Sequence, residues 1–385
     1  MKKKMVTIGA LAGMALTVGG VGVSQAAWDT SNLPLGTSSS TPEHIAVLVA
    51  TTNPNNTGAS VVSSVAVSAM TGVNTGATTD RMATLRSGQT YANMGLAPVG
   101  PAGSTSAANV VKKPGVWGVA VGSWGDQDDI KNEKGFEYNI YGVMLGYDRN
   151  ITDSWLVGIN AGYANADVDS GITTNTDIDT MNVGLYSSYS FGQTFIDYGV
   201  MYSANNADSD RDIRDGDNVY RAIGEPDADV WTVYVQMGYE IPYENFVLTP
   251  IVGVQHSSVD SDSYTESDQG SGLGLDVKSS NDDFFSATAG VKGEYFVSNQ
   301  LHLKGHVKYT HEFSDDLQHM TTARFNAGTA FFNTAGIDID QNRYNIGIGM
   351  KYLLSEDLSL NVDYDLELAD EFDAHTGSIG MKYNF

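Results

Sequence analysis

Ionisable side chains recur at every second position in several segments of the C-terminal part of the chain. Alternate residues of an extended strand point to the same face, so these side chains are predicted to lie opposite apolar residues such as Leu303 and Val307. Their positions are Lys292, Glu294, His302, Lys304, His306, Lys308, Glu312, Lys351, Asp363, Asp365 and Glu367. A charged side chain facing lipid costs roughly 2–4 kcal/mol at the middle of a bilayer. We therefore expect this face to line a water-filled interior or to contact partners.

Two groups of these residue types invite a metal-binding interpretation, and their spacing argues against it. His302 and His306 lie about 13 Å apart on a strand by rise alone, which is too far for one zinc ion. In the acidic run from Asp208 to Asp217, Ile213 stands where an EF-hand requires glycine, and Val219 stands where it requires glutamate. The sequence therefore predicts no metal site, and a solvated acidic loop over residues 204–229.

Catalytic chemistry has little support in the sequence. The chain contains no cysteine, which excludes thiol catalysis and thiolate–metal centres. The pairs His256–Ser257 and His311–Asp315 are the candidates for a barrel hydrolase, and no G-x-S-x-G motif accompanies them. We expect no enzymatic activity, no catalytic residue and no cofactor, with a barrel hydrolase as the weaker alternative.

The elements that must position these side chains are alternating apolar segments between residues 115 and 385. The last of them places Ile379, Met381, Tyr383 and Phe385 on one face. Tight turns are predicted at residues 149–154, 192–194, 242–245, 297–300 and 355–357, and long polar loops at 126–135, 167–177, 204–229, 257–283 and 314–341. Short turns on one side and long loops on the other are typical of outer-membrane barrels. The fold class predicted is all-β, a transmembrane antiparallel β-barrel of about twelve strands.

A further segment, Met320 to Phe332, could be counted as a thirteenth strand. A single-chain bacterial barrel normally has an even number of strands, and the alternation of this segment is weak. We assign it to a long loop.

The sequence of the N-terminal part predicts export, followed by a short, weakly structured arm with few large apolar residues. Residues 1–26 have the charge, apolar run and small-residue end of a signal peptide. Val61 to Met70 is a run of small apolar and serine residues, and Thr79 to Arg86 has the pattern of one or two helical turns. Asn55-Asn56 is interpreted as a turn in preference to a self-cleavage point. The net charge of −25 excludes nucleic acid as a partner, because a phosphate backbone would be repelled.

Several motifs, in order, resemble the C-terminal translocator β-domain of autotransporters, the type V secretion family. They are Val116-Trp117-Gly118, Tyr141-Gly142 with Gly146-Tyr147-Asp148-Arg149, Gly184-Leu185-Tyr186-Ser187-Ser188-Tyr189, His311-Glu312-Phe313 and the terminal Phe385. Upstream, Asp80-Arg81-Met82 and Leu85-Arg86 resemble the segment in which a helix of this family threads the pore. The resemblance covers about 270 residues.

The resemblance implies a barrel in the cell outer membrane that exposes or exports an N-terminal passenger. It divides the chain into a signal peptide (1–26), a short passenger-like segment (27–76), a pore helix and linker carrying Arg81 and Arg86 (77–114), and the barrel (115–385). The implied partners are outer-membrane lipid, lipopolysaccharide and the barrel-assembly machinery, which reads Tyr383 and Phe385, and the barrel is expected to be monomeric. The expected function is to translocate the short N-terminal segment or be plugged by it, with acidic loops facing the medium. A small-solute channel is the alternative.

The end of the chain gives a first test of the barrel. Phe385→Ala, or deletion of Tyr383-Asn384-Phe385, should reduce insertion into the outer membrane more than it reduces synthesis. The terminal strand loses both lipid-facing area and the residues that assembly machinery reads. Quantifying the folded, heat-modifiable species against total protein would check this. A normal yield of folded barrel after the deletion would contradict it.

Overall fold

The computed structural model describes residues 72, 75–83, 86, 114–130, 134–170, 173–215, 217–314, 320–336 and 340–385. The predicted signal peptide, the passenger-like segment up to residue 71 with Asn55-Asn56, and residues 87–113 of the predicted linker lie outside these residues. Among the described residues, no helix is both long enough and apolar enough to cross a membrane.

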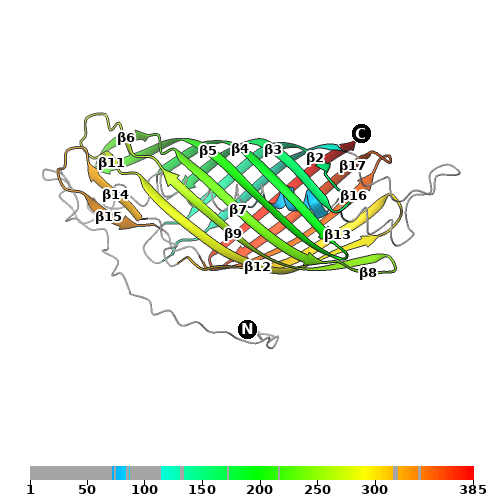
Figure 1. Cartoon of the computed structure of the whole chain (residues 1–385). Helices are drawn as coiled ribbons and strands as arrows, with labels where there is room; N and C mark the ends of the chain where they lie inside the picture. The colour runs from blue at the N-terminus through cyan, green and yellow to red at the C-terminus, as the bar shows by residue number, and fades with distance from the viewer. Residues whose placement is uncertain are drawn as a thin grey trace, which may run out of the picture.

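Twelve antiparallel strands form a closed barrel, as the sequence predicts (Figure 1). They are β1 (Gly115–Gln127), β2 (Phe136–Asn150), β3 (Trp155–Ser170), β4 (Thr174–Phe191), β5 (Thr194–Asp215), β7 (Ala228–Tyr239), β9 (Phe246–Ser261), β12 (Ser280–Phe296), β13 (Leu301–Glu312), β16 (Asn342–Leu353), β17 (Leu358–Ala369) and β18 (Phe372–Asn384). Each strand pairs with its neighbours in this order, and β18 pairs with β1 to close the ring. Tight connections gather at the end of the barrel where β8 (Ile241–Tyr243) and the C-terminus lie, which we call the turn end; the opposite end is the loop end.

The pairing of β1 with β18 runs over the whole length of both strands, from Gly115 opposite Asn384 to Gln127 opposite Phe372. The amide of Phe385 extends it with a 3.0 Å hydrogen bond to the carbonyl of Pro114. A bilayer core offers no water to unpaired backbone groups, so a sheet that spans it must close on itself. The terminal strand predicted from the sequence is this closing strand.

The outer face of the barrel is apolar. Leu145, Ile348 and Met181 are 69%, 66% and 65% exposed, although each is a large apolar side chain. Exposed aromatic residues lie toward the turn end at Trp155, Tyr189, Tyr239, Tyr295, Tyr352 and Tyr383, and toward the loop end at Tyr202, Trp231, Tyr309 and Tyr344. An apolar band between two sets of aromatic residues is the lipid-facing surface of an outer-membrane barrel.

Two of the predicted long loops are wrong, because the strands continue past the apolar band. Strand β3 ends at Ser170 and β4 begins at Thr174, so most of the predicted loop at 167–177 is paired strand. Strand β5 continues to Asp215 and pairs there with β6 (Asn218–Gly224), which replaces most of the predicted loop at 204–229. Backbone pairing continues there because alternate residues still face inward and are buried, including Ile178 and Ile213.

The acidic run Asp208–Asp217 is therefore largely a strand, and its side chains are divided between two faces. Asp208 and Asp210 are on the outer face, and Asp210 pairs with the exposed Arg221 of β6. Asp215 is buried on the inner face. The prediction of a solvated loop is wrong at this position, because strand pairing fixes the backbone.

A second, four-stranded sheet lies at the loop end and consists of β10 (Tyr264–Thr265), β11 (Leu275–Val277), β14 (Met320–Phe325) and β15 (Phe332–Ala335). Met320 to Phe325 is thus a strand, so its assignment to a loop is wrong, although it is not a barrel strand. Buried Ala323 and Phe325 pack with Leu275, Val277 and Tyr264, which explains why this short segment is ordered as a strand. The buried ion pair between Arg211 and Glu266 links β5 to the connection beside β10.

The loop-end extensions of β3, β4 and β5 bring acidic residues face to face. Asp177 lies beyond Met181, the last apolar residue of the outer row of β4, and pairs in register with Asp167 and Asp208. A hydrogen bond with Asp167, together with burial and the neighbouring carboxylates, raises the pKa of Asp177 to about 6 from an ordinary value of 3.8. A proton shared between the carboxyl groups of Asp177 and Asp167 removes repulsion between them and so stabilises the pairing of β3 with β4.

This shift predicts a pH dependence of the extensions. Because the folded-state pKa of Asp177 is raised, its stabilising contribution is complete below about pH 4 and is lost as the pH rises through about 6. Hydrogen-exchange protection of the amides around Val168 and Ile178, corrected for intrinsic exchange rates, should fall over this interval. Asp177→Asn should remove the change, whereas Asp169→Asn should retain it. The same fall in Asp177→Asn would assign the effect to other groups.

Candidate functional site in the barrel lumen

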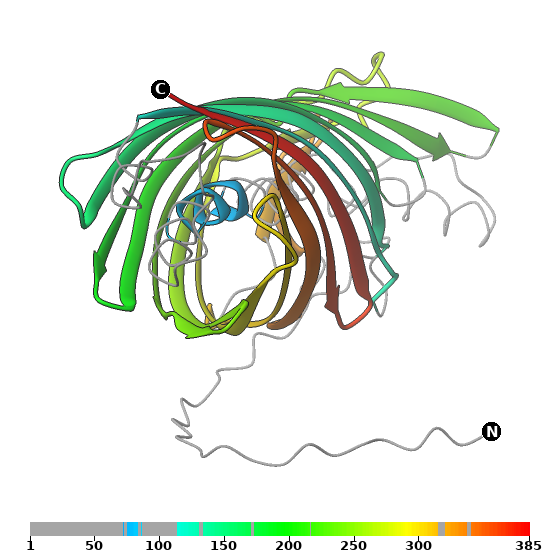
Figure 2. The same ribbon diagram turned by 90° about the vertical axis from the view of Figure 1, so that its right-hand side faces the viewer.

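A helical segment lies inside the ring of strands, where Figure 2 shows it in blue. Residues 75–83 are helical, as are residues 72 and 86. Within this helix, the hydroxyls of Thr78 and Thr79 donate hydrogen bonds to the carbonyl of Thr75 at 3.1 and 2.8 Å. The predicted start at Thr79 is wrong, because residues 75–78, including Gly76, are already helical. Glycine lowers helix propensity by about 1 kcal/mol, and packing against the lumen wall stabilises helices that propensity alone would not.

Arg81 anchors the helix to β2. Its guanidinium forms a two-pronged ion pair with the carboxylate of Asp148, and both side chains are buried. The hydroxyl of Tyr186 donates a 2.9 Å hydrogen bond to the same carboxylate. The indole of Trp117 in turn donates a 2.7 Å hydrogen bond to that hydroxyl. The carboxylate is thus held by one helix residue and by two strands of the wall.

Arg86 makes a second anchor on a different part of the wall, toward the turn end. It contacts the carboxylate of Asp197 at 2.5 Å, the hydroxyl of Ser188 at 2.9 Å and the carboxylate of Glu240 at 3.5 Å. Its guanidinium also lies over the ring of Phe195, 3.5 Å from the centroid. Arginine suits such a site because its planar fork binds carboxylates and also stacks on aromatic rings.

Apolar packing joins the two anchors. Met82 is completely buried among inward-facing side chains from six strands, namely Trp117, Met144, Leu156, Tyr186, Met201 and Tyr234. The hydroxyl of Tyr234 also donates a 3.0 Å hydrogen bond to the hydroxyl of Thr78. The helix therefore rests on a specific set of wall residues.

The ionisable row predicted from the sequence lies on the same inner face, on β12, β13, β16 and β17. Lys292 lies 3.6 Å from Asp80 of the helix. Within the row, Lys304 contacts Asp363 at 2.7 Å, His306 contacts Asp365 at 3.0 Å, and His302 contacts Glu294 at 2.8 Å. Lys351 is buried opposite His302 in register, and Lys308 lines a cavity of about 340 Å³ beside the helix.

Two glycines of β16 allow these pairs to form. In register, Gly349 lies between Lys304 and Asp363, and Gly347 lies between His306 and Asp365. A Cβ atom at Gly349 would collide with the carboxylate of Asp363, and one at Gly347 would collide with the imidazole of His306. Because glycine leaves the space above β16 empty, side chains of β13 reach across it to β17.

Sequence reasoning identified both arginines and missed the acids that bind them. Asp148, Asp197 and Glu240 were not predicted as lumen residues. A signal for the first two was present: Asp148 has the parity opposite to the apolar outer row of β2, and Asp197 lies between the apolar residues Ile196 and Tyr198. Asp148 and Asp197 are both buried on the inner side of their strands.

The pairs considered for a barrel hydrolase are not assembled by the described residues. His256 is half exposed on the outer face and lies 3.6 Å from Asp283. Ser257 is buried on the inner face and hydrogen bonds to Thr232. His311 contacts Asn342 at 3.0 Å, and Asp315 lies outside the described residues.

A closed twelve-stranded antiparallel barrel with an apolar outer band and a polar lumen defines an outer-membrane β-barrel. The family model of the autotransporter β-domain matches residues 116–365. The chain therefore belongs to the autotransporter β-domain family, and it is located in the outer membrane as a translocator barrel of type V secretion. This domain is a transporter barrel and not a catalytic domain.

Similar proteins agree with this assignment. The translocator domain of the autotransporter NalP from Neisseria meningitidis has a TM-score of 0.59 at 14% identity, covering 81% of this chain and 98% of that chain. The transport unit of AIDA-I from Escherichia coli has a TM-score of 0.51 at 17% identity, covering 77% and 97%. An extracellular serine protease of Serratia marcescens is 21% identical over 70% of this chain, and the match spans 26% of that protein. Outer membrane protein A of Rickettsia conorii is 24% identical over 65% of this chain and 13% of its own length.

The anchor at Arg81 predicts strong coupling with Asp148. Arg81→Met and Asp148→Asn should each destabilise the folded protein by about 3–5 kcal/mol, because each leaves one buried charge without its partner. The double variant should recover much of this loss. Urea unfolding in detergent, with the four proteins compared as a double-mutant cycle, would measure the coupling. Additive losses would show that the two side chains do not depend on each other.

Proposed function

We propose that this autotransporter barrel translocates its short N-terminal segment or is plugged by it, with residues 75–86 retained in the lumen. In this proposal residues 1–26 are removed as a signal peptide, and residues 27–76 form a short passenger-like segment. A pore helix and linker (77–114) join that segment to the barrel (115–385). The observation that supports the proposal is that Arg81 and Arg86 bind buried acids on separate parts of the wall.

The residues of the lumen wall have a role in this proposal. Lys292, Glu294, His302, Lys304, His306, Lys308, Lys351, Asp363 and Asp365 would line the lumen and keep it wet where the helix does not fill it. Their ion pairs with one another support this role, because paired charges do not bind a passing chain tightly. Because the charges of the wall are paired with one another, the wall offers a passing polypeptide few sites that bind it tightly.

The proposal also extends to partners. The apolar outer band would contact lipid and lipopolysaccharide, and Tyr383 and Phe385 would be read by the barrel-assembly machinery. The acidic side chains at the loop end would face the medium, which the exposed positions of Asp208 and Asp210 support. A monomeric barrel is sufficient for all these roles.

A small-solute channel is the second candidate function. The observation that favours it is the cavity of about 340 Å³ between the helix and the wall, lined by Lys304, His306 and Asp363 among others. In a channel of this kind the helix would narrow the lumen without closing it.

Removal of the helix tests the proposal directly. A protein without residues 27–95 should still assemble as a barrel, and its single-channel conductance in planar bilayers should be several-fold higher, because the helix no longer occupies the lumen. A protein without residues 27–60 is the matched control, since it keeps the helix and should keep the low conductance. Equal conductance of both proteins would mean that the lumen is closed by its own side chains or loops.

A further inference from the structure

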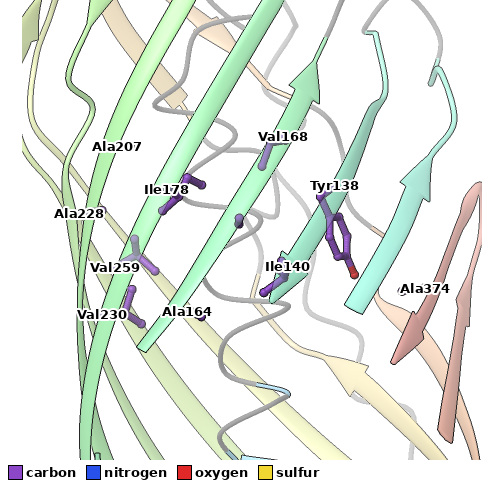
Figure 3. Packing of buried hydrophobic residues seen from close by; sticks show 11 residues of the cluster. Tyr138, Ile140, Ala164, Val168, Ile178, Ala207, Ala228, Val230, Val259 and Ala374 are labelled. Carbon is purple, nitrogen blue, oxygen red and sulfur yellow. The ribbon is translucent and has the colours of Figure 1, made fainter. Parts of the chain in front are cut away.

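The inner wall of the barrel is apolar toward the loop end, in contrast to the charged wall around Arg81 and Arg86. Figure 3 shows the side chains that form it, which we call the inner apolar wall. Its members are Tyr138, Ile140, Ala164, Ala166, Val168, Ile178, Ala207, Ala228, Val230, Val259 and Ala374. They come from seven barrel strands, β2, β3, β4, β5, β7, β9 and β18.

Every side chain of the inner apolar wall is buried, with an exposed fraction between 0% and 6%. The lumen of a twelve-stranded barrel is wider than its own side chains can fill. Phe136, Phe284 and Phe372 of the barrel strands pack against part of this wall. An alanine such as Ala166 or Ala207 has one methyl group, and an occupant of the lumen at this level would cover the rest of the wall.

The described helical residues pack at a different level, nearer the turn end. Thr75, at the far end of the nine consecutive helical residues, lies 3.3 Å from Gln255 of β9. Val259 of the inner apolar wall is four residues further along β9, about 13 Å toward the loop end. None of the described helical residues belongs to the cluster that forms the wall.

The direction of the helix identifies the segment that reaches this level. Arg86 contacts residues at the turn end, whereas Thr75 is closer to the loop end. In the N-terminal direction, the axis of the described helix therefore points toward the inner apolar wall. At 1.5 Å per helical residue, and allowing for strand tilt, about seven residues span the offset from Thr75 to Val259. That length of chain reaches into Val61–Met70.

The composition of this segment matches the wall. Val61–Met70 reads Val-Val-Ser-Ser-Val-Ala-Val-Ser-Ala-Met, with small apolar residues, serines and no charge. The inner apolar wall is made of alanine, valine, isoleucine and one tyrosine, with buried threonine and serine such as Thr180 and Ser257 between them. An uncharged, small-residue segment can enter such a wall without burying an unpaired charge.

We propose that the inner apolar wall is the docking surface for Val61–Met70 of the same chain. This inference rests on the proposed retention of residues 75–86 in the lumen and extends it to a second, apolar contact. The lumen then holds the N-terminal region in two ways: ion pairs bind the helix at the turn end, and apolar packing binds Val61–Met70 toward the loop end. Only residues upstream of Val61 would be free to reach the medium.

Cysteine cross-linking tests the docking, because the native chain contains no cysteine. Val65→Cys combined with Ile178→Cys should form a disulfide in the assembled outer-membrane protein under mild oxidation. The matched control combines Val65→Cys with Met181→Cys, on the same strand but on the lipid-facing side. The cross-linked fraction should be roughly tenfold higher for the Ile178 pair, because docking raises the effective concentration of the two thiols. Peptide mass spectrometry identifies the bond.

Two further pairs make the outcome decisive. A pair of Thr75→Cys and Gln255→Cys tests the helix independently and leaves both arginine anchors intact, so retention of the helix and docking of Val61–Met70 can fail separately. A pair of Val110→Cys and Ile178→Cys tests whether the linker occupies the wall. Cross-linking of Val110 in place of Val65 would overturn the inference. Labelling of Val65→Cys by a membrane-impermeant maleimide on intact cells, without cross-linking to Ile178→Cys, would also overturn it.

Discussion

The pairing of β1 with β18 is the interaction on which the rest of the molecule depends. A membrane-spanning sheet cannot leave a row of backbone N–H and C=O groups unpaired, because lipid offers no hydrogen bonds in exchange. The first and last strands of the barrel meet along their whole length, and the hydrogen bond from Phe385 to Pro114 continues the pairing past the end of the strands. Once the ring is closed, the side-chain period of two assigns every residue of every strand to lipid or to lumen.

Closure creates a lumen that the side chains of the strands do not fill. The charged groups that line this lumen are paired in two ways. On β13, β16 and β17 the charged residues neutralise one another, and Gly349 gives Lys304 the space to reach Asp363 across an intervening strand. On β2 and β5 the acids Asp148 and Asp197 are buried and bind arginines of the helix. An isolated buried carboxylate costs several kcal/mol, so the helix stabilises this half of the wall by pairing both acids.

Beyond the lipid-facing band the strands obey a different constraint. Polar and acidic residues replace the apolar outer row, yet the inner row stays buried and the backbone stays paired, as at Ile178 of β4. Strand β5 therefore continues until it returns as β6, and Arg211 on its inner face holds Glu266 near the small four-stranded sheet. Water permits loops at this end, but buried inner side chains maintain strands.

The sequence alone determined the features that depend on local period. Alternation from residue 115 onward predicted the barrel, its twelve strands, the lipid-facing row ending in Tyr383 and Phe385, and the parity of the ionisable row from Lys292 to Asp365. These predictions hold for the fold because a strand has an exact period of two, so the face of each residue follows from its neighbours. The helical pattern from Thr79 to Arg86 and the family resemblance placed a helix near Arg81, although the helix begins before Thr79.

Only the tertiary structure decided which residues of the shared inner face meet. Arg81 is 67 positions from Asp148 and Arg86 is 111 from Asp197, and no local pattern specifies a partner at such separations. The strand Met320–Phe325 and the extensions of β3, β4 and β5 were missed for the same physical reason. They are strands because buried partners from distant segments, such as Leu275 beside Phe325, cover one of their faces. Their polar and acidic composition, taken by itself, indicates a loop.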